Sequence, residues 1–213
     1  MTTMHAREAD VYSRLGLPWI PPELRHDTGE IEAAAAGRLP ILVERKDIRG
    51  DLHMHSTYSD GQDAMEQIIG AAAALGYEYV AMTDHSERAA ASRTLREDQI
   101  DRQREEIEHL REQHPGLTIL HGVEVDILPD GRLDFSDTIL ERFDIVLASL
   151  HDAARQDGAA LTRRCLQAIH HPLVNVITHP SNQLVGRRAG YPLDYERIYE
   201  AAVDAGTALE IDG

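Results

Sequence analysis

The chain has 213 residues, 42% of them hydrophobic, and its 37 acidic and 21 basic side chains give a formal net charge of −16. This charge argues against a broad nucleic-acid-binding surface, although bound divalent cations would offset part of it. The one cysteine, Cys165, excludes a disulfide framework and a thiolate zinc site within the chain. No apolar stretch approaches the roughly 20 residues of a membrane span, and the first residues lack a signal-peptide core. We therefore expect a cytoplasmic protein with no membrane partner.

The first 45 residues differ in composition from the rest. Proline removes a backbone donor and disfavours helix at the residue before it, so much of this stretch is expected to be extended or turn. The prolines that matter are Pro18, Pro21, Pro22 and Pro40. One short helix is predicted over 28–36, with Thr28 as its N-cap. Such a segment is not expected to fold alone.

From Ile48 onward, short runs of Val, Ile and Leu alternate with longer amphipathic segments. This alternation predicts parallel βα units with right-handed crossovers, in an open sheet or a barrel. The predicted strands are 48–53, 78–83, 118–125, 144–150, 174–179 and 207–212. The predicted helices are 63–75, 97–113, 159–170 and 194–205.

Histidines and carboxylates stand at the carboxyl end of every predicted strand. In parallel α/β folds these ends lie on one face, where active sites are built. The residues concerned are His53, His55, Asp84, His85, Glu124, Asp126, His151, His179, Glu210 and Asp212. One strand-end histidine is unremarkable, but so many on one rim predict a metal site rather than packing.

The stretch GDLHMHSTYSDG carries the first part of that site. His53 and His55 are two residues apart on a strand, so they point to the same side and suit one ion. Asp60 follows in a loop, beside Gly61, which permits a tight turn. Imidazole and carboxylate without thiolate suit Zn²⁺, Mn²⁺ or Fe²⁺, usually at a catalytic site. His121, at the start of the third strand, is interpreted as structural.

The motifs H-x-H, S-D-G, T-D-H, G-x-E-x, S-x-H and T-H-P, in this order, resemble those of the PHP (polymerase and histidinol phosphatase) superfamily. The leader, followed by DIRGDLHMHSTYSDG, resembles the junction between the thumb and the PHP domain of bacterial family X DNA polymerases. The resemblance implies an α/β fold, a distorted seven-stranded βα barrel. It divides the chain into residues 1–45, the end of a thumb region and a linker, and residues 46–213, the PHP domain. Because the chain stops at Gly213, before the family's late D-x-H motif, we expect the barrel to lack its final strand.

The resemblance also implies a centre of up to three divalent ions, Mn²⁺ or Zn²⁺ and alternatively Fe²⁺. Catalytic roles would fall to Glu124 and His151. From its position and charge, Arg188, or alternatively Arg187, is expected to orient a phosphate oxygen. Without the D-x-H motif, the first and third ions would each lack one ligand. The implied ligand groups are His53, His55 and Glu124 for the first ion, Glu124, His151 and His179 for the second, and Asp60 and His85 for the third.

The activity implied is metal-dependent hydrolysis of a phosphate ester. The leader favours a 3′→5′ exonuclease or another enzyme acting on DNA 3′ ends, whereas the charge of −16 favours a small phosphomonoester such as histidinol phosphate. A third hypothesis is a catalytically impaired fragment that binds metal. Such a fragment would need a partner or a further C-terminal segment to complete its barrel.

Overall fold

The structure is a computed structural model that describes residues 7–89, 93–152, 155–184 and 186–211. The chain divides into two compact units, Met1–Ile48 and Arg49–Gly213. Each unit is described by itself below. In the described part of the chain, no helix is long and apolar enough to cross a bilayer.

The first unit consists of short helices joined by extended segments, as its prolines predict. Arg25, at the end of the turn Pro22–Leu24, holds this turn against α1, because it pairs with Glu8 at 2.7 Å and stacks over the ring of Tyr12. The helical elements are α1 (Glu8–Arg14), the 3₁₀ turns Pro22–Leu24 and Arg45–Asp47, and α2 (Glu30–Ala35).

The N-cap predicted for the short helix in this unit is wrong by one residue. Gly29, not Thr28, is the N-cap of α2, with a left-handed φ of 98° that glycine adopts without strain. The backbone N–H groups of Asp27 and Thr28 instead donate to the carboxylate of Glu30, at 3.0 and 2.8 Å. Glu30 therefore fixes the turn that leads into α2, and no side chain in the described part of the unit caps this helix.

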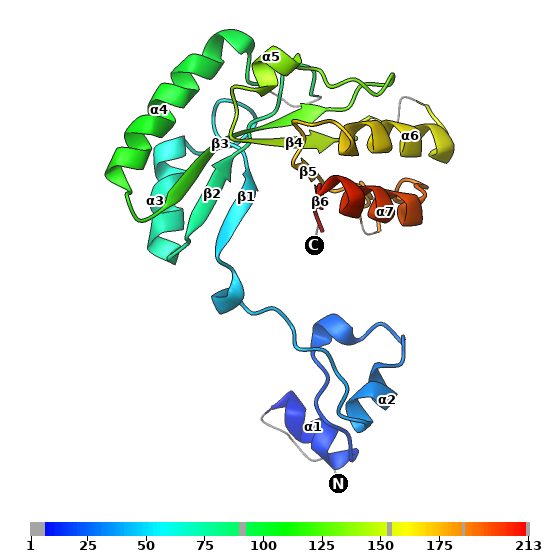
Figure 1. Ribbon diagram of the computed structural model, residues 1–213. Helices are drawn as coiled ribbons and strands as arrows, with labels where there is room; N and C mark the ends of the chain where they lie inside the picture. The colour runs from blue at the N-terminus through cyan, green and yellow to red at the C-terminus, as the bar shows by residue number, and fades with distance from the viewer. Residues whose placement is uncertain (1–6, 90–92, 153–154, 185, 212–213) are drawn as a thin grey trace. The chain divides into compact units, whose positions relative to one another are not determined.

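The second unit contains one parallel sheet, in which every predicted strand is present. Its spatial order is β1-β2-β3-β4-β5-β6, the same as the order in sequence (Figure 1). Each strand pairs with the next in parallel, so all carboxyl ends lie at one rim. The strands are β1 (Gly50–Met54), β2 (Tyr79–Met82), β3 (Thr118–Asp126), β4 (Ile145–Ser149), β5 (Val176–Ile177) and β6 (Ala208–Leu209).

Helices connect the strands, and each predicted helix is found within a few residues of its expected bounds. Figure 1 shows α3 and α4 beside β1 to β3, and α6 and α7 beside β4 to β6. Arrays of this kind make the α/β half-barrel that the sequence predicts. The helices are α3 (Met65–Leu75), α4 (Ile100–Gln113) after the 3₁₀ turn Glu97–Gln99, α5 (Asp137–Leu140), α6 (Gly158–Ile169) and α7 (Tyr195–Ala205).

Two apolar clusters hold these helices against the sheet. One joins α3 and α4 to β2 through Ile69, Ile107 and Met82, all fully buried. The other joins α6 and α7 to the later strands through residues such as Cys165 and Ile198, which are also fully buried. Close packing of this kind gives the rim a rigid base.

The last two strands are much shorter than predicted. β5 and β6 pair over two residues each, and β5 is followed by Thr178 and then His179, whose φ of 26° is not extended. The chain therefore turns out of the sheet where the pattern predicted a strand to residue 179. Asp212, placed in the predicted sixth strand, lies outside the described residues.

Candidate metal centre

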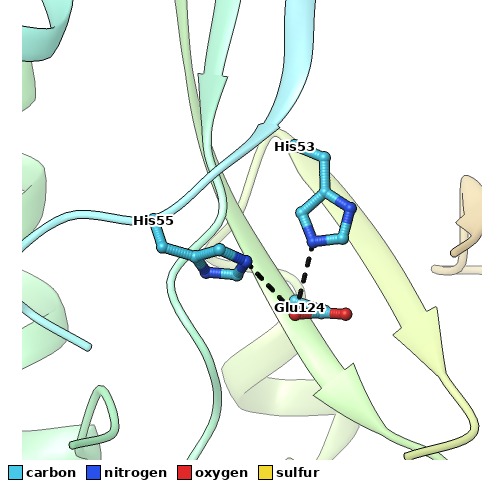
Figure 2. Close-up of side chains that lie close together, drawn as sticks. All are labelled: His53, His55 and Glu124. Carbon is cyan, nitrogen blue, oxygen red and sulfur yellow. Dashed lines mark ion pairs between the residues drawn. The ribbon is translucent and has the colours of Figure 1, made fainter. Parts of the chain in front are cut away.

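Glu124, on β3, is the centre of the cluster at the carboxyl rim. Its side chain is fully buried, and the rings of His53 and His55 point at it from the end of β1 (Figure 2). His53 Nε2 lies 3.3 Å and His55 Nε2 lies 3.6 Å from the same oxygen, Glu124 Oε2. The period of two in H-x-H therefore brings both rings to one carboxylate, as predicted.

Three further histidines reach Glu124 from other strand ends. His85, after β2, places Nδ1 at 2.8 Å from Oε2. His151, after β4, and His179, after β5, place Nε2 at 3.2 and 3.1 Å from Oε1. Five imidazoles thus surround one carboxylate, with two of them on one oxygen and three on the other.

Asp60 also belongs to this cluster, beside His85 and His55. Its Oδ1 lies 3.7 Å from His85 Nε2, and Asp60, His55 and His85 place one ligand atom each within 4.8 Å of one another. His53, His55 and Glu124 form a second such group, and His85, Glu124 and His151 a third. The structure therefore brings together all seven residues predicted from the sequence as metal ligands.

The loop between His55 and Asp60 is held by Asp84, which is fully buried beside His85. Asp84 accepts hydrogen bonds from the backbone N–H and the hydroxyl of both Ser56 and Ser59, at 2.6 to 3.1 Å. Glycine is required at Gly61, because a Cβ there would lie 2.1 Å from the His55 carbonyl oxygen. These contacts fix the turn that returns Asp60 toward His55.

Two carboxylates orient the histidines from behind. His151 Nδ1 hydrogen-bonds to Asp126, and His53 Nδ1 lies 2.9 Å from Glu210 Oε1. Glu210 also accepts from the backbone N–H of His179 at 2.8 Å. A carboxylate on the remote ring nitrogen fixes the tautomer and the direction of a ligating imidazole. The sequence places both acids at strand ends, but it does not identify them as partners of particular histidines. The available signals were the strand-end position of each acid and, for Asp126, its spacing of two from Glu124.

Comparison with known proteins identifies this arrangement. Residues 51–207 match the family described as "PHP domain". The chain belongs to the PHP domain family. Members of this family are metal-dependent phosphoesterases.

Relatives of this PHP chain include polymerases and phosphatases. It is 40% identical over 205 residues to the "DNA polymerase/3′-5′ exonuclease PolX" of Bacillus subtilis, covering 96% of this chain and 36% of that protein. It is 32% identical to a "probable phosphatase" of Syntrophotalea carbinolica, covering 76% of this chain and 64% of that protein. The chain thus spans only about a third of the first relative and under two thirds of the second.

A solved structure supports the fold. Histidinol phosphate phosphatase from Lactococcus lactis, crystallised with zinc, L-histidinol and phosphate, superposes with a TM-score of 0.57. It is 22% identical and the match covers 76% of this chain and 72% of that one. The likeness identifies the PHP barrel architecture, of which this sheet makes the larger part.

The donor set of the PHP centre fits divalent metal ions. Within the centre, four atoms of described residues are buried without a hydrogen-bond partner: His53 Nε2, His55 Nδ1, His85 Nδ1 and Glu124 Oε2. Buried polar groups are normally satisfied, and His53 Nε2 and His85 Nδ1 both lie within 3.3 Å of Glu124 Oε2, so these three atoms together indicate a missing partner. Neutral imidazoles and carboxylates suit Zn²⁺, Mn²⁺ and Fe²⁺.

The protonation of the metal-free PHP centre reflects this crowding. Burial alone would raise the pKa of Glu124, but hydrogen bonds from His151, His179 and His53 hold it far below its ordinary range. Burial would lower the pKa of His53, yet Glu124 and Glu210 raise it to about 10. For His151, Asp126 and Glu124 likewise outweigh burial and raise the pKa to about 10. Without metal, the Glu124 carboxylate therefore lies beside the imidazolium groups of His53 and His151, whereas burial, together with His85, lowers the pKa of His55.

Two other sequence interpretations involve residues away from Glu124. Arg188 is exposed and donates to the backbone and side chain of Asn182, in the loop after His179, so its role toward phosphate stays a prediction. His121 is fully buried, with Nε2 at 2.9 Å from Gln103 Oε1 and its ring against Phe143, in keeping with a structural role.

Proposed function

We propose that this chain is a PHP-type phosphoesterase whose centre holds up to three divalent ions and which hydrolyses phosphodiesters at DNA 3′ ends. The observation that carries the proposal is the convergence of five histidines on Glu124, at 2.8 to 3.6 Å. Such a cluster is costly to bury unless cations occupy it, because its polar atoms are otherwise unsatisfied.

Each part of the centre has a chemical task in this proposal. Bound divalent ions would supply Lewis acidity, activating water and neutralising charge on the phosphoryl oxygens. Glu124 presents one oxygen to His53, His55 and His85 and the other to His151 and His179, so it is suited to bridge two ions. Asp126 and Glu210 keep the remote ring nitrogens engaged, so the nitrogens facing Glu124 are available as ligands.

A DNA substrate is supported by the extent of the similarity to the B. subtilis polymerase–exonuclease. That similarity includes most of the first unit, which lies outside the PHP match. We accordingly assign residues 1–45 to the end of a polymerase thumb and its linker, and residues 46–213 to the PHP domain. The division into compact units after Ile48 supports this boundary.

The test measures hydrolysis of two substrates by the whole chain with added Mn²⁺. Labelled single-stranded DNA reports 3′→5′ exonuclease activity, and p-nitrophenyl phosphate reports phosphomonoesterase activity. The proposal expects turnover of DNA that requires metal and is lost in a His53→Ala/His55→Ala variant. An exposed pair on α4, replaced in His109→Ala/Gln113→Ala, serves as the matched control and should keep wild-type rates.

The alternatives predict different results in the same assay. Turnover of p-nitrophenyl phosphate but not DNA would favour a small-molecule phosphatase, for which the charge of −16 and the Syntrophotalea relative are the supporting observations. No turnover of either substrate, with about one tightly held ion per chain by elemental analysis, would contradict the enzyme and favour a metal-binding fragment.

A further inference from the structure

Arg164, on α6, is a cation buried behind the metal centre. Its exposed fraction is 3%, which is rare for arginine. Its Nη1 donates to the Asp152 carbonyl oxygen at 2.8 Å and to Gln156 Oε1 at 3.0 Å, and its Nη2 donates to the Ile127 carbonyl oxygen. One guanidinium therefore joins the end of β3 to the connection between β4 and α6.

Two of its acceptors directly follow residues of the centre. Ile127 comes after Asp126 at the end of β3, and Asp152 comes after His151 beyond β4. Asp126 and His151 hydrogen-bond to each other through His151 Nδ1. Arg164 thus connects the backbone of Ile127 to that of Asp152, and each of these residues directly follows one member of the Asp126–His151 pair.

Arg164 is one of several groups that hold the segment carrying His151; the Tyr191 hydroxyl, for example, donates to the His151 carbonyl oxygen at 3.3 Å. β4 ends at Ser149, and α6 begins at Gly158, so His151 and Asp152 lie outside regular structure. Gln156, from the same connection, accepts from Arg164 and donates to the Pro129 carbonyl oxygen at 2.8 Å. The guanidinium and Gln156 therefore tie this connection to the end of β3, in addition to the hydrogen bond from the Ile127 N–H to the Ser149 carbonyl oxygen at 2.9 Å.

Burying this cation is costly, which argues that its contacts matter. Burial lowers the pKa of Arg164, and its Nε is buried without a hydrogen-bond partner among the described residues. An apolar side chain of similar volume would avoid both costs. The planar fork of arginine, which a lysine ammonium lacks, is what allows one residue to reach three acceptors in two segments.

We propose that Arg164 is a positioning residue for the metal centre: it holds the ends of β3 and β4 in register so that Asp126 directs His151 toward Glu124. This inference rests on the proposed function, because it takes His151 to be a metal ligand. Arg164 itself contacts neither substrate nor metal, and it acts through Ile127 and Asp152. Loss of such support commonly weakens metal binding by about 10- to 100-fold.

The experiment compares Zn²⁺ and Co²⁺ binding by metal-stripped wild type, Arg164→Met, Arg164→Lys and Arg163→Met. Zn²⁺ affinity is measured by calorimetric titration, and ligand geometry by the visible absorption of bound Co²⁺. Arg163, the exposed neighbour on α6, is the matched control. Arg164→Met is expected to weaken one class of Zn²⁺ site at least tenfold and to change the Co²⁺ spectrum. Arg164→Lys is expected to show a smaller loss, and Arg163→Met none.

Each outcome decides the inference. If Arg164→Met keeps the wild-type Zn²⁺ affinity and the wild-type Co²⁺ spectrum, Arg164 does not position the centre. If Arg164→Met does not fold, the same criterion is applied to Arg164→Lys. A lowered melting temperature alone would mean a purely structural role and would also contradict the inference. If wild type itself binds neither ion, the proposed function fails, and this inference fails with it.

Discussion

His53 Nδ1 lies 2.9 Å from Glu210 Oε1, so a histidine on the first strand of the sheet contacts a glutamate that follows the last strand. β1 and β6 are the two edges of the sheet and do not pair through their backbones. A side-chain contact therefore joins these edges at the rim where the metal centre lies. The same glutamate holds the backbone of His179.

This contact predicts the effect of Glu210→Gln. The amide cannot carry the negative charge that holds His53, so the ring of His53 and the turn at His179 should both loosen. We expect Zn²⁺ affinity to fall about tenfold or more, as for other carboxylates behind metal-bound histidines. Calorimetric titration measures it, with Glu200→Gln on the exposed face of α7 as control. Equal affinity in Glu210→Gln and wild type would contradict the role given to Glu210.

Glu124→Ala should be more damaging than loss of any single histidine. Both of its oxygens face histidines, so its removal affects every group of ligands around it. Elemental analysis after dialysis should show less retained metal in Glu124→Ala than in His53→Ala or His179→Ala. Glu112→Ala, an exposed acid on α4, should match wild type. The bridging role is refuted if Glu124→Ala keeps the wild-type metal content.

Metal binding should release protons. The pKa values of His53 and His151 are raised to about 10 in the metal-free protein, so both rings are protonated near pH 7. A metal ion binds only the neutral ring, so binding must expel these protons, and apparent affinity should rise with pH until about pH 10. Titrations of Zn²⁺ in buffers of different ionisation enthalpy should report release of up to two protons. A binding enthalpy independent of the buffer would contradict this prediction.

His121 should make stability depend on pH. Burial, with Arg104 nearby, lowers its pKa to about 4, whereas an unfolded histidine titrates near 6.5. Above pH 6.5 the ring is neutral in both states; below it, the unfolded chain takes up a proton that the folded chain does not. The free energy of unfolding should therefore fall as pH drops from 6.5 to 4, by up to about 3 kcal/mol from this residue.

The variant His121→Gln isolates this effect, because every other titrating group is shared with wild type. Urea unfolding of both proteins across this pH range should show that wild type loses more stability than the variant. If the free energies of unfolding of wild type and His121→Gln changed with pH in parallel, His121 would be protonated in the folded state or exposed, which contradicts the prediction.

The fold and the predicted ligands follow from patterns that are local in the sequence. Apolar runs of the right length marked each strand, and the residues after those runs proved to share one rim because all the strands are parallel. The partners behind the histidines did not follow in this way. That Asp126 meets His151, and Glu210 meets His53, depends on strand register and on the curvature of the sheet. Neither is visible in a single sequence.

The contacts of Arg164 also depend on tertiary packing that a single sequence does not show. In the sequence, Arg164 is one of two adjacent arginines in the middle of an amphipathic helix. Its spacing from Leu161 and Ala168 places Arg164 on the apolar face, but no local pattern identifies the acceptors of its guanidinium. The packing of α6 against the ends of β3 and β4 buries Arg164 and leaves Arg163 exposed. The φ of 26° at His179 was equally unpredictable, because the strand propensity of its neighbours favours an extended backbone.

The order of strands in the sheet has a consequence for how the protein is made. Because spatial order follows sequence order, each strand meets a partner that has already been synthesised, and the sheet can grow from β1 toward β6. The metal centre cannot grow in this way, since it draws on His53 at the beginning and Glu210 at the end. The ring of histidines and the carboxylates behind it are therefore complete only once Glu210 has been synthesised.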